Sequence, residues 1–448
     1  MEMLDSWVET LAGWIWGLPL IVLLCGTHLW MTWRTGFVQK RIFEAIRISF
    51  SKEKDSPGDV SHFGALTTAL AATVGAGNII GVGVAVAAGG PGAVFWMWLT
   101  GVFGMATKYA EGLLAVKYRV KNDRGEMSGG PMFVLERALG LRWLAVLFAI
   151  FTAIAAFGIG NMFQAKAISG QVVEMFGGTD ETFLRTIVGI VLAVATAAVV
   201  IGGIKWIARF CSFFVPLMIV FYIIGCLYIL LVNIGGIPAA VWLILTDAFS
   251  GQAVAGGALG VVIQQGIKRG LFSNESGLGS APIAAAAAKT NSPTRQALVS
   301  MTGTFWDTVV VCLLTGLVLV VSGAWKTERT GAGLTHEAFA AIPVIGQPVL
   351  TLGLLTFVYS TLIGWSYYGE KAIEYLGGLK WIGVYRWLWV LAVFLGATIP
   401  SSLVINFADS ANGLMAVPNL IALLLLSGVI AAETREYFSR PLRESGER

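Results

Sequence analysis

Two stretches of small and polar residues interrupt long apolar segments of this sequence. The first lies in the middle of residues 64–90 and contains Thr73, Gly75, Gly77 and Asn78. The second lies in the middle of residues 254–290, around the run SNES. Such residues weaken a helix, and a helix that breaks leaves N–H and C=O groups without partners. Freed N–H groups attract a carboxylate and freed C=O groups attract a hard cation. The two stretches therefore indicate a binding site formed by the main chain.

A simpler interpretation is that the glycines only allow close helix packing. Gly77 and Gly81 do have the GxxxG spacing. Packing does not account for Asn78 beside the first break, or for SNES at the second. The run GAGNIIG, residues 75–81, also resembles a dinucleotide-binding loop, but no βαβ unit precedes it. We therefore favour a ligand site at both breaks.

The composition places most of the chain in a lipid bilayer. Hydrophobic residues make up 56% of the 448 residues, charged residues only 12%, and the mean hydropathy is +0.77. A water-soluble domain carries about 25% charged residues, so we predict an all-α integral membrane protein. The net charge of +4 is too small to indicate nucleic acid as a partner. The 3 histidines are scattered and the 4 cysteines form no CxxC pair, which indicates neither an enzyme nor a transition-metal site.

The apolar segments predict eleven membrane-spanning helices. They fall near residues 12–33, 64–90, 92–116, 142–174, 183–204, 210–233, 254–290, 297–322, 347–376, 381–400 and 403–431. A spanning helix needs about 20 residues, so the shorter apolar run 238–249 indicates a helix at one surface. An unbroken helix through 254–290 would be about 55 Å long, against a hydrocarbon core of about 30 Å. Its middle is therefore predicted to unwind.

The distribution of Lys and Arg sets the orientation. With these spans, most of the 30 basic residues fall on one side, and the other side holds only Arg185, Lys326 and Arg329. Cytoplasmic loops carry the excess of Lys and Arg. The sequence thus predicts a multi-pass plasma-membrane protein with its N-terminus outside and its C-terminus in the cytoplasm.

The two interrupted segments are the second and the seventh, five spans apart. An odd offset gives them opposite orientations, which is typical of an inverted repeat. We therefore predict a five-plus-five arrangement. Its parts are an N-terminal region with one peripheral helix (1–58), a first repeat (59–233), an extracytoplasmic loop (234–250), a second repeat (251–431) and a cytoplasmic tail (432–448).

Several charged residues fall within the spans, where each costs roughly 2.5–3.5 kcal/mol at mid-membrane. Lys108 and Glu111 are three residues apart on one helix face and are predicted to pair. Glu275 is predicted to hold the second break by pairing with Lys268 or Arg269. Such charges must pair, reach the interface or line water.

The stretch GGPGAVFWMWLTGVFGMATKYAE, residues 89–111, resembles the signature of the alanine or glycine:cation symporter family, part of the amino acid–polyamine–organocation superfamily. Other stretches are also similar to that family, among them GEMSGGPMF, KRGLFSNESGLGSAPIAAAAAKT and STLIGWSYYGEK. The resemblance covers residues 58–430. It implies the inverted-repeat fold of the leucine transporter and movement of a small amino acid together with Na⁺.

The resemblance also implies a sodium site. In that fold, carbonyls of the first core helix and hydroxyls of the eighth hold the ion. The candidates here are Ala71, Val74, Phe357, Ser360 and Thr361. The alternative for the two hydroxyls is ordinary bonding to carbonyls of their own helix.

For the substrate, the resemblance and the breaks together suggest main-chain ligands. The carboxylate is expected at the N–H groups of Gly75, Gly77 and Asn78, next to Thr73, and Asn78 is also a candidate cation ligand. The ammonium group is expected at the carbonyls of the second break. Gln164 either contacts the substrate or bonds between helices. The expected residues of the second break and the pocket walls are Phe157, Phe272, Ser273, Asn274 and Trp365.

These inferences predict a secondary transporter that carries alanine, and also glycine, into the cell with Na⁺ by alternating access. We expect a monomer in the bilayer. The alternative is proton coupling, with Glu275, Lys268 or Lys166 carrying the charge. A channel or a membrane enzyme is the remaining alternative, but the sequence offers no nucleophile–base set for an enzyme.

Overall fold

The structure is a computed structural model that describes residues 7, 10–11, 13–51, 53, 56–176, 180–250, 259–329, 331–340, 342, 346–399 and 402–439. Parts of several predicted regions lie outside these residues, among them the first residue of the span 12–33 and the last residue of the span 381–400. The start of the span 254–290, Lys52 and Lys54 of the N-terminal region, and the tail after residue 439 also lie outside them.

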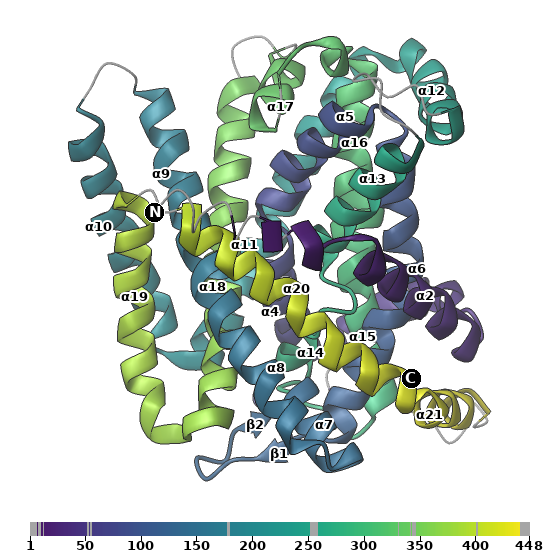
Figure 1. Cartoon of the computed structure of the whole chain (residues 1–448), viewed down its shortest axis with the longest axis vertical. Coiled ribbons are helices and arrows are strands. Elements are labelled where there is room, and N and C mark those ends of the chain that lie inside the picture. The colour runs from purple at the N-terminus through teal and green to yellow at the C-terminus, as the bar shows by residue number, and fades with distance from the viewer. Residues whose placement is uncertain are drawn as a thin grey trace.

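The first half of the chain is a succession of helices (Figure 1). They are α2 (Leu18–Arg34), η1 (Val38–Arg41), α3 (Ile42–Ser49), α4 (His62–Thr73), η2 (Gly77–Gly81), α5 (Val82–Gly89), α6 (Ala93–Lys117), α7 (Pro131–Leu139), α8 (Arg142–Ala155), η3 (Ala156–Met162), α9 (Phe163–Met175), α10 (Glu181–Val200) and α11 (Gly203–Val232). Two of the short turns, η2 and η3, are π-helical.

The second half continues in the same way. Its helices are η4 (Ile234–Gly236), α12 (Ile237–Ser250), α13 (Leu259–Asn274), α14 (Ala281–Ala285), α15 (Pro293–Thr304), η5 (Phe305–Cys312, π-helical), α16 (Leu313–Val321), η6 (Ala324–Lys326), α17 (Ala332–Phe339), α18 (Gly346–Gly377), η7 (Leu379–Trp381), α19 (Ile382–Thr398), α20 (Ser402–Leu425) and α21 (Ser427–Ser439). A helix is present at the predicted surface run 238–249. The last predicted span ends at residue 425, earlier than expected, and a separate helix follows it.

Among the described residues, seven helices are long and apolar enough to cross a membrane. The number rises to eight if α4 and the η2–α5 helix, bent by 53°, form one span. Three predicted spans fall outside this test: α2 and α13, which are 17 and 16 residues long, and α6, whose C-terminal half carries charges. The multi-pass, mostly helical architecture is confirmed. The count of eleven and the inverted repeat stay predictions.

The sequence predicts an all-α protein, but the described residues also include a two-stranded sheet. β1 (Val120–Lys121) and β2 (Met127–Ser128) pair antiparallel, with Val120 opposite Ser128 and Lys121 opposite Met127. This hairpin lies beside α7 at the bottom of Figure 1. It belongs to the loop between α6 and α7.

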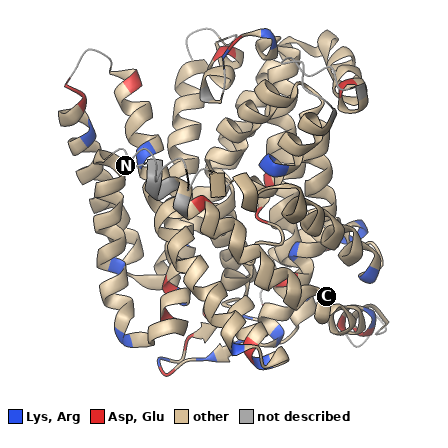
Figure 2. Ribbon diagram, in the orientation of Figure 1, with Lys and Arg blue, Asp and Glu red and all other residues tan. Residues whose placement is uncertain are grey.

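The interrupted helices occupy the interior of the molecule. α4 packs against α11, α14, α15 and α18, while α13 packs against α5 and α6. Large apolar side chains are exposed on α2, α10, α11 and α19, where lipid would cover them. Charged residues gather near the two ends of the molecule and are few in between (Figure 2). The breaks are therefore surrounded by protein, as irregular backbone at membrane depth requires.

Candidate functional site

The first break lies between α4 and η2 and is held by a side chain. α4 ends at Thr73, and Val74 is extended (φ −75°, ψ 94°). The Gly75 N–H donates to Asn78 Oδ1 at 2.8 Å. In a continuous helix this N–H would donate to the Ala71 carbonyl, four residues earlier. Asn78 therefore diverts the Gly75 N–H and leaves the Ala71 carbonyl for another ligand.

That carbonyl belongs to a cluster of buried oxygens. Ser360 Oγ, on α18, lies 3.3 Å from Ala71 O and 3.4 Å from Val74 O. Ser360 Oγ and Thr361 Oγ1 lie 2.8 and 3.1 Å from Phe357 O. The contacts with Phe357 are ordinary bonds within one helix, but the contacts across to α4 are not. The structure thus brings together all five predicted sodium ligands, and they supply only neutral oxygens, which suit a hard cation.

A buried carboxylate joins the two breaks. Asp307, on η5, is fully buried. Its Oδ1 accepts from Asn78 Nδ2 at 2.8 Å, and its Oδ2 accepts from Ser273 Oγ at 2.9 Å. Thr308 Oγ1 donates to the same Oδ2 at 2.6 Å. Because Asn78 belongs to the first break and Ser273 adjoins the second, Asp307 fixes their separation.

The second break, residues 275–280, is built around a carboxylate from α6. Glu275, Gly277 and Gly279 have positive φ (54°, 90° and 85°), so the chain leaves the helical path here. Glu111 Oε1 accepts from the N–H groups of Gly277 and Gly279 at 3.0 Å each, and from Asn419 Nδ2 at 2.7 Å. The N–H groups of this turn are thus bound by the protein itself.

Glu275 does not form the predicted pair with Lys268 or Arg269. Its Oε1 accepts from Trp365 Nε1 at 3.1 Å, and its Oε2 accepts from Ser280 Oγ at 2.5 Å. The left-handed backbone at Glu275 turns its side chain away from the helical face that carries the two cations. The predicted pair is not found among the described residues, because the Glu275 carboxylate is bound by Trp365 and Ser280 instead.

A cavity of about 190 Å³ lies between the first break and the last turns of α13. Gly77 and Phe272 line it, and Gly77 lies so close to Ser273 that an added Cβ would be 3.3 Å from Ser273 Cα. Lys268 and Arg269 also line it, together with Ala76, Ile80, Gly81, Val84, Ile159, Phe163, Asn406 and Asp409. Sites for drug-sized ligands span about 300–1,000 Å³, so this cavity suits a smaller solute.

Comparison with known proteins identifies the family. The model described as the sodium:alanine symporter family matches residues 1–447. The chain belongs to the sodium:alanine symporter family.

Similar proteins extend over nearly the whole chain. The sodium/alanine symporter AgcS of Methanococcus maripaludis is 54% identical over 443 residues, covering 96% of this chain and 97% of that protein. An uncharacterized transporter of Haemophilus influenzae is 50% identical over 446 residues, covering 98% and 97%. Among solved structures, MhsT in complex with L-phenylalanine has a TM-score of 0.58 and 15% identity, covering 84% of this chain and 98% of that one. This last likeness shows the fold, which is leucine-transporter-like.

Two predicted pocket residues of this symporter lie on the third core helix, α8–η3–α9. Gln164 is buried; its Nε2 donates to Ile159 O at 3.0 Å, within its own helix. Its Oε1 has no hydrogen-bond partner in the part of the chain that the structure describes. The predicted alternative, a bond between helices, is therefore not found there. A buried acceptor remains for an ammonium group.

Phe157, the other residue, packs away from the breaks. Its ring centroid lies 5.4 Å from that of Tyr385 and 5.5 Å from that of Trp389, both on α19. Ile159 and Phe163 line the cavity from this helix instead. The prediction of Phe157 as a pocket wall is wrong because the π-helical turn η3 adds a residue and rotates the face that meets the cavity.

Lys108 and Glu111 form the predicted ion pair. Lys108 Nζ lies 3.9 Å from Glu111 Oε2, both side chains are buried, and neither atom has a hydrogen-bond partner among the described residues. Lys108, Thr73 and Asn274 line a second cavity of about 10 Å³, room for about one water molecule. Thr73 and Asn274 therefore lie on the side of α4 and α14, away from the larger cavity.

The start of α4 and the end of α14 are joined to each other by the main chain; we call them the inner ends because the Lys and Arg distribution predicts that they face the cytoplasm. Val60 and Ala288 form a parallel bridge, and Lys289 N–H donates to Val60 O at 2.7 Å. Gly58 approaches Ala288 so closely that an added Cβ would overlap its carbonyl. The inner ends of the two interrupted helices are thus tied together in this state.

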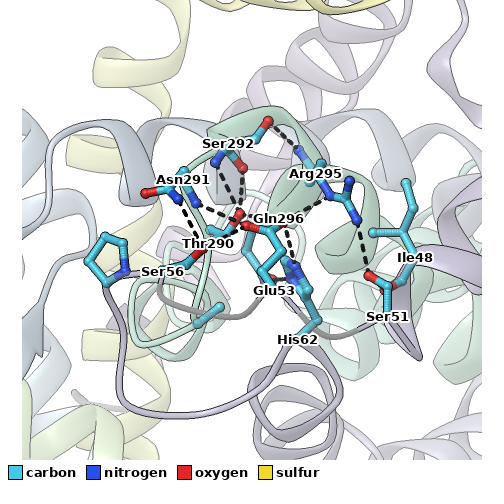
Figure 3. Close-up of polar contacts among 12 residues, drawn as sticks. Ile48, Ser51, Glu53, Ser56, His62, Thr290, Asn291, Ser292, Arg295 and Gln296 are labelled. Atoms are coloured by element: carbon cyan, nitrogen blue, oxygen red, sulfur yellow. Dashed lines mark hydrogen bonds and ion pairs between the residues drawn. The ribbon is translucent and has the colours of Figure 1, made fainter. Parts of the chain in front are cut away.

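A carboxylate network reinforces this junction (Figure 3). Glu53 Oε1 lies 2.8 Å from Arg295 Nε and 3.2 Å from His62 Nε2, and Asn291 N–H donates to Glu53 Oε2 at 3.1 Å. Burial raises the pKa of Glu53, but the bonds from His62 and Asn291 and the charge of Arg295 outweigh it and lower the pKa to about 2. Glu53 is therefore charged at physiological pH.

Sequence reasoning missed three parts of the site of this symporter. They are the binding of Glu111 to the second break, the contribution of Asn419, and the link between the breaks through Asp307. Each is a buried polar side chain on an otherwise apolar span. That rarity is itself a functional signal, but it does not identify the partner.

Proposed function

We propose that this protein is a sodium-coupled symporter that carries alanine by alternating access around the two breaks. The observation that carries the proposal is the cluster of five neutral buried oxygens beside the first break. Family membership supports it, as does the 54% identity to a protein named as a sodium/alanine symporter.

Sodium binds at the oxygen cluster. The carbonyls of Ala71, Val74 and Phe357 and the hydroxyls of Ser360 and Thr361 supply its ligands. On binding, the hydroxyl protons turn away from the carbonyls, and each oxygen faces the ion. Because Asn78 frees the Ala71 carbonyl, the ion stabilises the broken form of α4 over a continuous helix.

Alanine binds between the breaks, in the adjoining cavity. Of the three N–H groups proposed for its carboxylate, that of Gly75 donates to Asn78 Oδ1 and that of Asn78 donates to Gly75 O at 3.2 Å. Gly77 N–H is therefore the primary donor. The ammonium group meets the carbonyls of Phe272 and Ser273, in the last turn of α13, and Gln164 Oε1.

The small volume of the cavity limits the side chain of the substrate. Phe272 lines it directly. Trp365, another predicted wall, is buried and held by its bond to Glu275, but it is not among the residues that line this cavity. Glycine, which is smaller than alanine, is accepted by the same site.

The direction of transport is into the cell. The cavity lies on the side of α5 and α13, which the Lys and Arg distribution places outside, whereas the inner ends of α4 and α14 are tied together. A neutral zwitterion gains nothing from the membrane potential. One sodium ion moving with it at 100 mV supplies about 2.3 kcal/mol, roughly fifty-fold accumulation.

Uptake into proteoliposomes tests the proposal. Labelled alanine and glycine are offered with an inward gradient of Na⁺, Li⁺ or H⁺ at clamped potential. We expect concentrative uptake with Na⁺ and saturation by the amino acid. Absence of Na⁺-driven uptake of both solutes contradicts the proposal, and current without saturation indicates a channel.

Proton coupling is the second candidate. The observation that favours it is the pair of buried groups next to the breaks, Glu275 and Lys108, whose ammonium is paired with Glu111 but has no hydrogen-bond partner among the described residues. The same vesicles decide between the two: uptake driven by H⁺ at fixed Na⁺ supports proton coupling, and uptake that follows Na⁺ at fixed pH supports sodium coupling.

A further inference from the structure

We propose that a pocket at the C-terminal end of α2 binds the headgroup of an anionic phospholipid. The pocket lies between α2 and α21, is distinct from the cavity at the breaks, and has a volume of about 400 Å³. Residues that are far apart in sequence meet in it: Trp33, Arg34, Thr35 and Gly36 from one side, and Arg435 and Phe438 from the other.

The pocket presents two guanidinium groups without a carboxylate. None of the described residues that line it is acidic. Arg34 Nε is buried without a hydrogen-bond partner among the described residues. Arg435 Nε donates to Ala431 O at 3.2 Å, which uses one of the five N–H donors of the guanidinium. Planar N–H forks of this kind match the oxygens of a phosphate group.

Two carboxylates of α21 and α3 are paired with other cations. Glu433, on α21, pairs with Lys117, and Glu44, on α3, pairs with Arg41. They therefore do not neutralise the two arginines of the pocket. The site attracts an anion.

The surroundings indicate a lipid as the source of that anion. Leu29, Trp30 and Trp33 of α2 are 54%, 41% and 61% exposed. An exposed apolar face that ends in tryptophans is typical of a helix that faces acyl chains and reaches the membrane–water boundary. A bound phospholipid would place its chains along this face and its phosphate at the two arginines.

The position of the pocket in the bilayer agrees with this ligand. The C-terminal end of α2 and α21 lie on the lower right of Figure 1, toward the end that also carries α7 and the hairpin. The distribution of Lys and Arg assigns that end to the cytoplasm. Cytoplasmic leaflets contain anionic lipids, and basic pockets between helices at that level bind their headgroups.

A purely structural role explains less. Arg34 at the last turn of α2 would interact with the helix dipole, and its guanidinium lies 5.7 Å from the Trp30 ring. Neither contact requires a pocket or a second arginine from α21. The convergence of Arg34 and Arg435 on one cavity is what the lipid accounts for.

Thermal unfolding of the purified full-length protein in detergent tests the site. Phosphatidylglycerol, phosphatidylcholine or inorganic phosphate is added to the parent, to the double variant Arg34→Gln/Arg435→Gln, and to Arg137→Gln. Arg137 is an exposed arginine of α7, outside the pocket, and serves as the matched control. We expect phosphatidylglycerol to raise the unfolding midpoint of the parent and of Arg137→Gln by several degrees. In the double variant, most of this rise should be lost.

Two outcomes overturn the proposal. An equal shift by phosphatidylglycerol in parent and double variant places the lipid elsewhere. If inorganic phosphate raises the unfolding midpoint of the parent as much as phosphatidylglycerol does, the pocket binds a free anion and not a lipid. If the double variant does not fold, native mass spectrometry of Arg34→Lys and Arg34→Gln gives the second measurement. Retained lipid in Arg34→Lys with several-fold less in Arg34→Gln supports the site, and equal retention in both contradicts it.

Discussion

The two breaks lie side by side, but different chemistry holds them open. At the first break the groups that contact the main chain are neutral: Asn78 Oδ1 binds the Gly75 N–H, and the freed Ala71 carbonyl faces the Ser360 hydroxyl of α18. The Asp307 carboxylate contacts this break only through the Asn78 side chain. At the second break the groups are charged: Glu111 binds two N–H groups, and Glu275 binds the indole of α18 and a hydroxyl.

This difference assigns the two breaks different tasks. A neutral carbonyl or hydroxyl exchanges one partner for an ion or water at a small net cost, typically about 1 kcal/mol. A buried carboxylate that loses its partners costs several kcal/mol. The first break is therefore suited to bind and release an ion in each transport cycle. The second break is suited to keep its shape throughout the cycle.

The largest expected effect comes from filling the space between the breaks. In Gly77→Leu the new Cβ would lie 3.3 Å from Ser273 Cα, and the side chain would occupy the place of the substrate carboxylate. We expect insertion into the membrane and loss of transport, measured as alanine uptake in proteoliposomes and alanine binding to the purified protein. Gly170→Leu, at a glycine of α9 with open space around it, is the control. Normal alanine affinity in Gly77→Leu contradicts the carboxylate site.

Removing the charge that holds the second break should cost most in stability. Glu111→Ala leaves the N–H groups of Gly277 and Gly279 without their acceptor and Lys108 without its counter-charge. We expect a loss of about 3–5 kcal/mol in the free energy of unfolding. Denaturant unfolding in detergent measures it.

The control for this variant is Glu433→Ala, which removes a more exposed ion pair with Lys117. Such a pair contributes about 1 kcal/mol or less. If both variants lose the same stability, the second break does not depend on the Glu111 carboxylate.

Sequence reasoning was most successful where the signal is local. Gly75, Gly77 and Asn78 mark the first break because each weakens a helix in its own neighbourhood, and the chain does turn there. The adjacent hydroxyls Ser360 and Thr361 were found through the family resemblance, and the structure places them against α4. Membrane architecture followed from composition alone.

It was least successful where the partner comes from elsewhere in the fold. Glu275 was predicted to pair with cations of its own helix because the effect of the predicted unwinding on the direction of its side chain was not considered. Phe157 was misplaced because a π-helical turn cannot be read from apolar spacing. The contact of Asn419 with Glu111 joins residues 308 positions apart, and nothing in either segment specifies the other.

A single hydroxyl at the first break should have a smaller effect, confined to sodium. Thr361→Ala removes one of five ion ligands, worth about 1.4 kcal/mol or a tenfold rise in the half-saturating Na⁺ concentration. We expect little change in alanine affinity at saturating Na⁺, because the substrate ligands remain. Sodium titration of alanine uptake measures both.

The matched control is Thr356→Ala. Thr356 lies on the same helix and its hydroxyl also donates to its own helix, to Leu352 O at 2.7 Å. It takes no part in the oxygen cluster. If the sodium titration of Thr361→Ala matches that of the parent, Thr361 is not a sodium ligand.

The smallest expected effect lies at the inner ends, where both interrupted helices meet. Glu53→Gln should lower the free energy of unfolding by about 1 kcal/mol, given the partial solvent exposure of the network. The pKa of Glu53 is lowered from its ordinary 4.5 to about 2, so its contribution is complete above pH 4.5 and is lost as the pH falls toward 2.

The difference in unfolding midpoint between parent and Glu53→Gln should therefore be constant from pH 8 to about pH 5 and shrink only below that. Glu44→Gln, which removes an exposed pair with Arg41 at 3.6 Å, should show almost no difference at any pH. A difference that already shrinks between pH 7 and pH 6 would mean that Arg295 and His62 do not hold the Glu53 carboxylate. The junction of the inner ends would then rest on the main-chain bridge of Val60 and Ala288 alone, and the two breaks would be coupled by backbone rather than by charge.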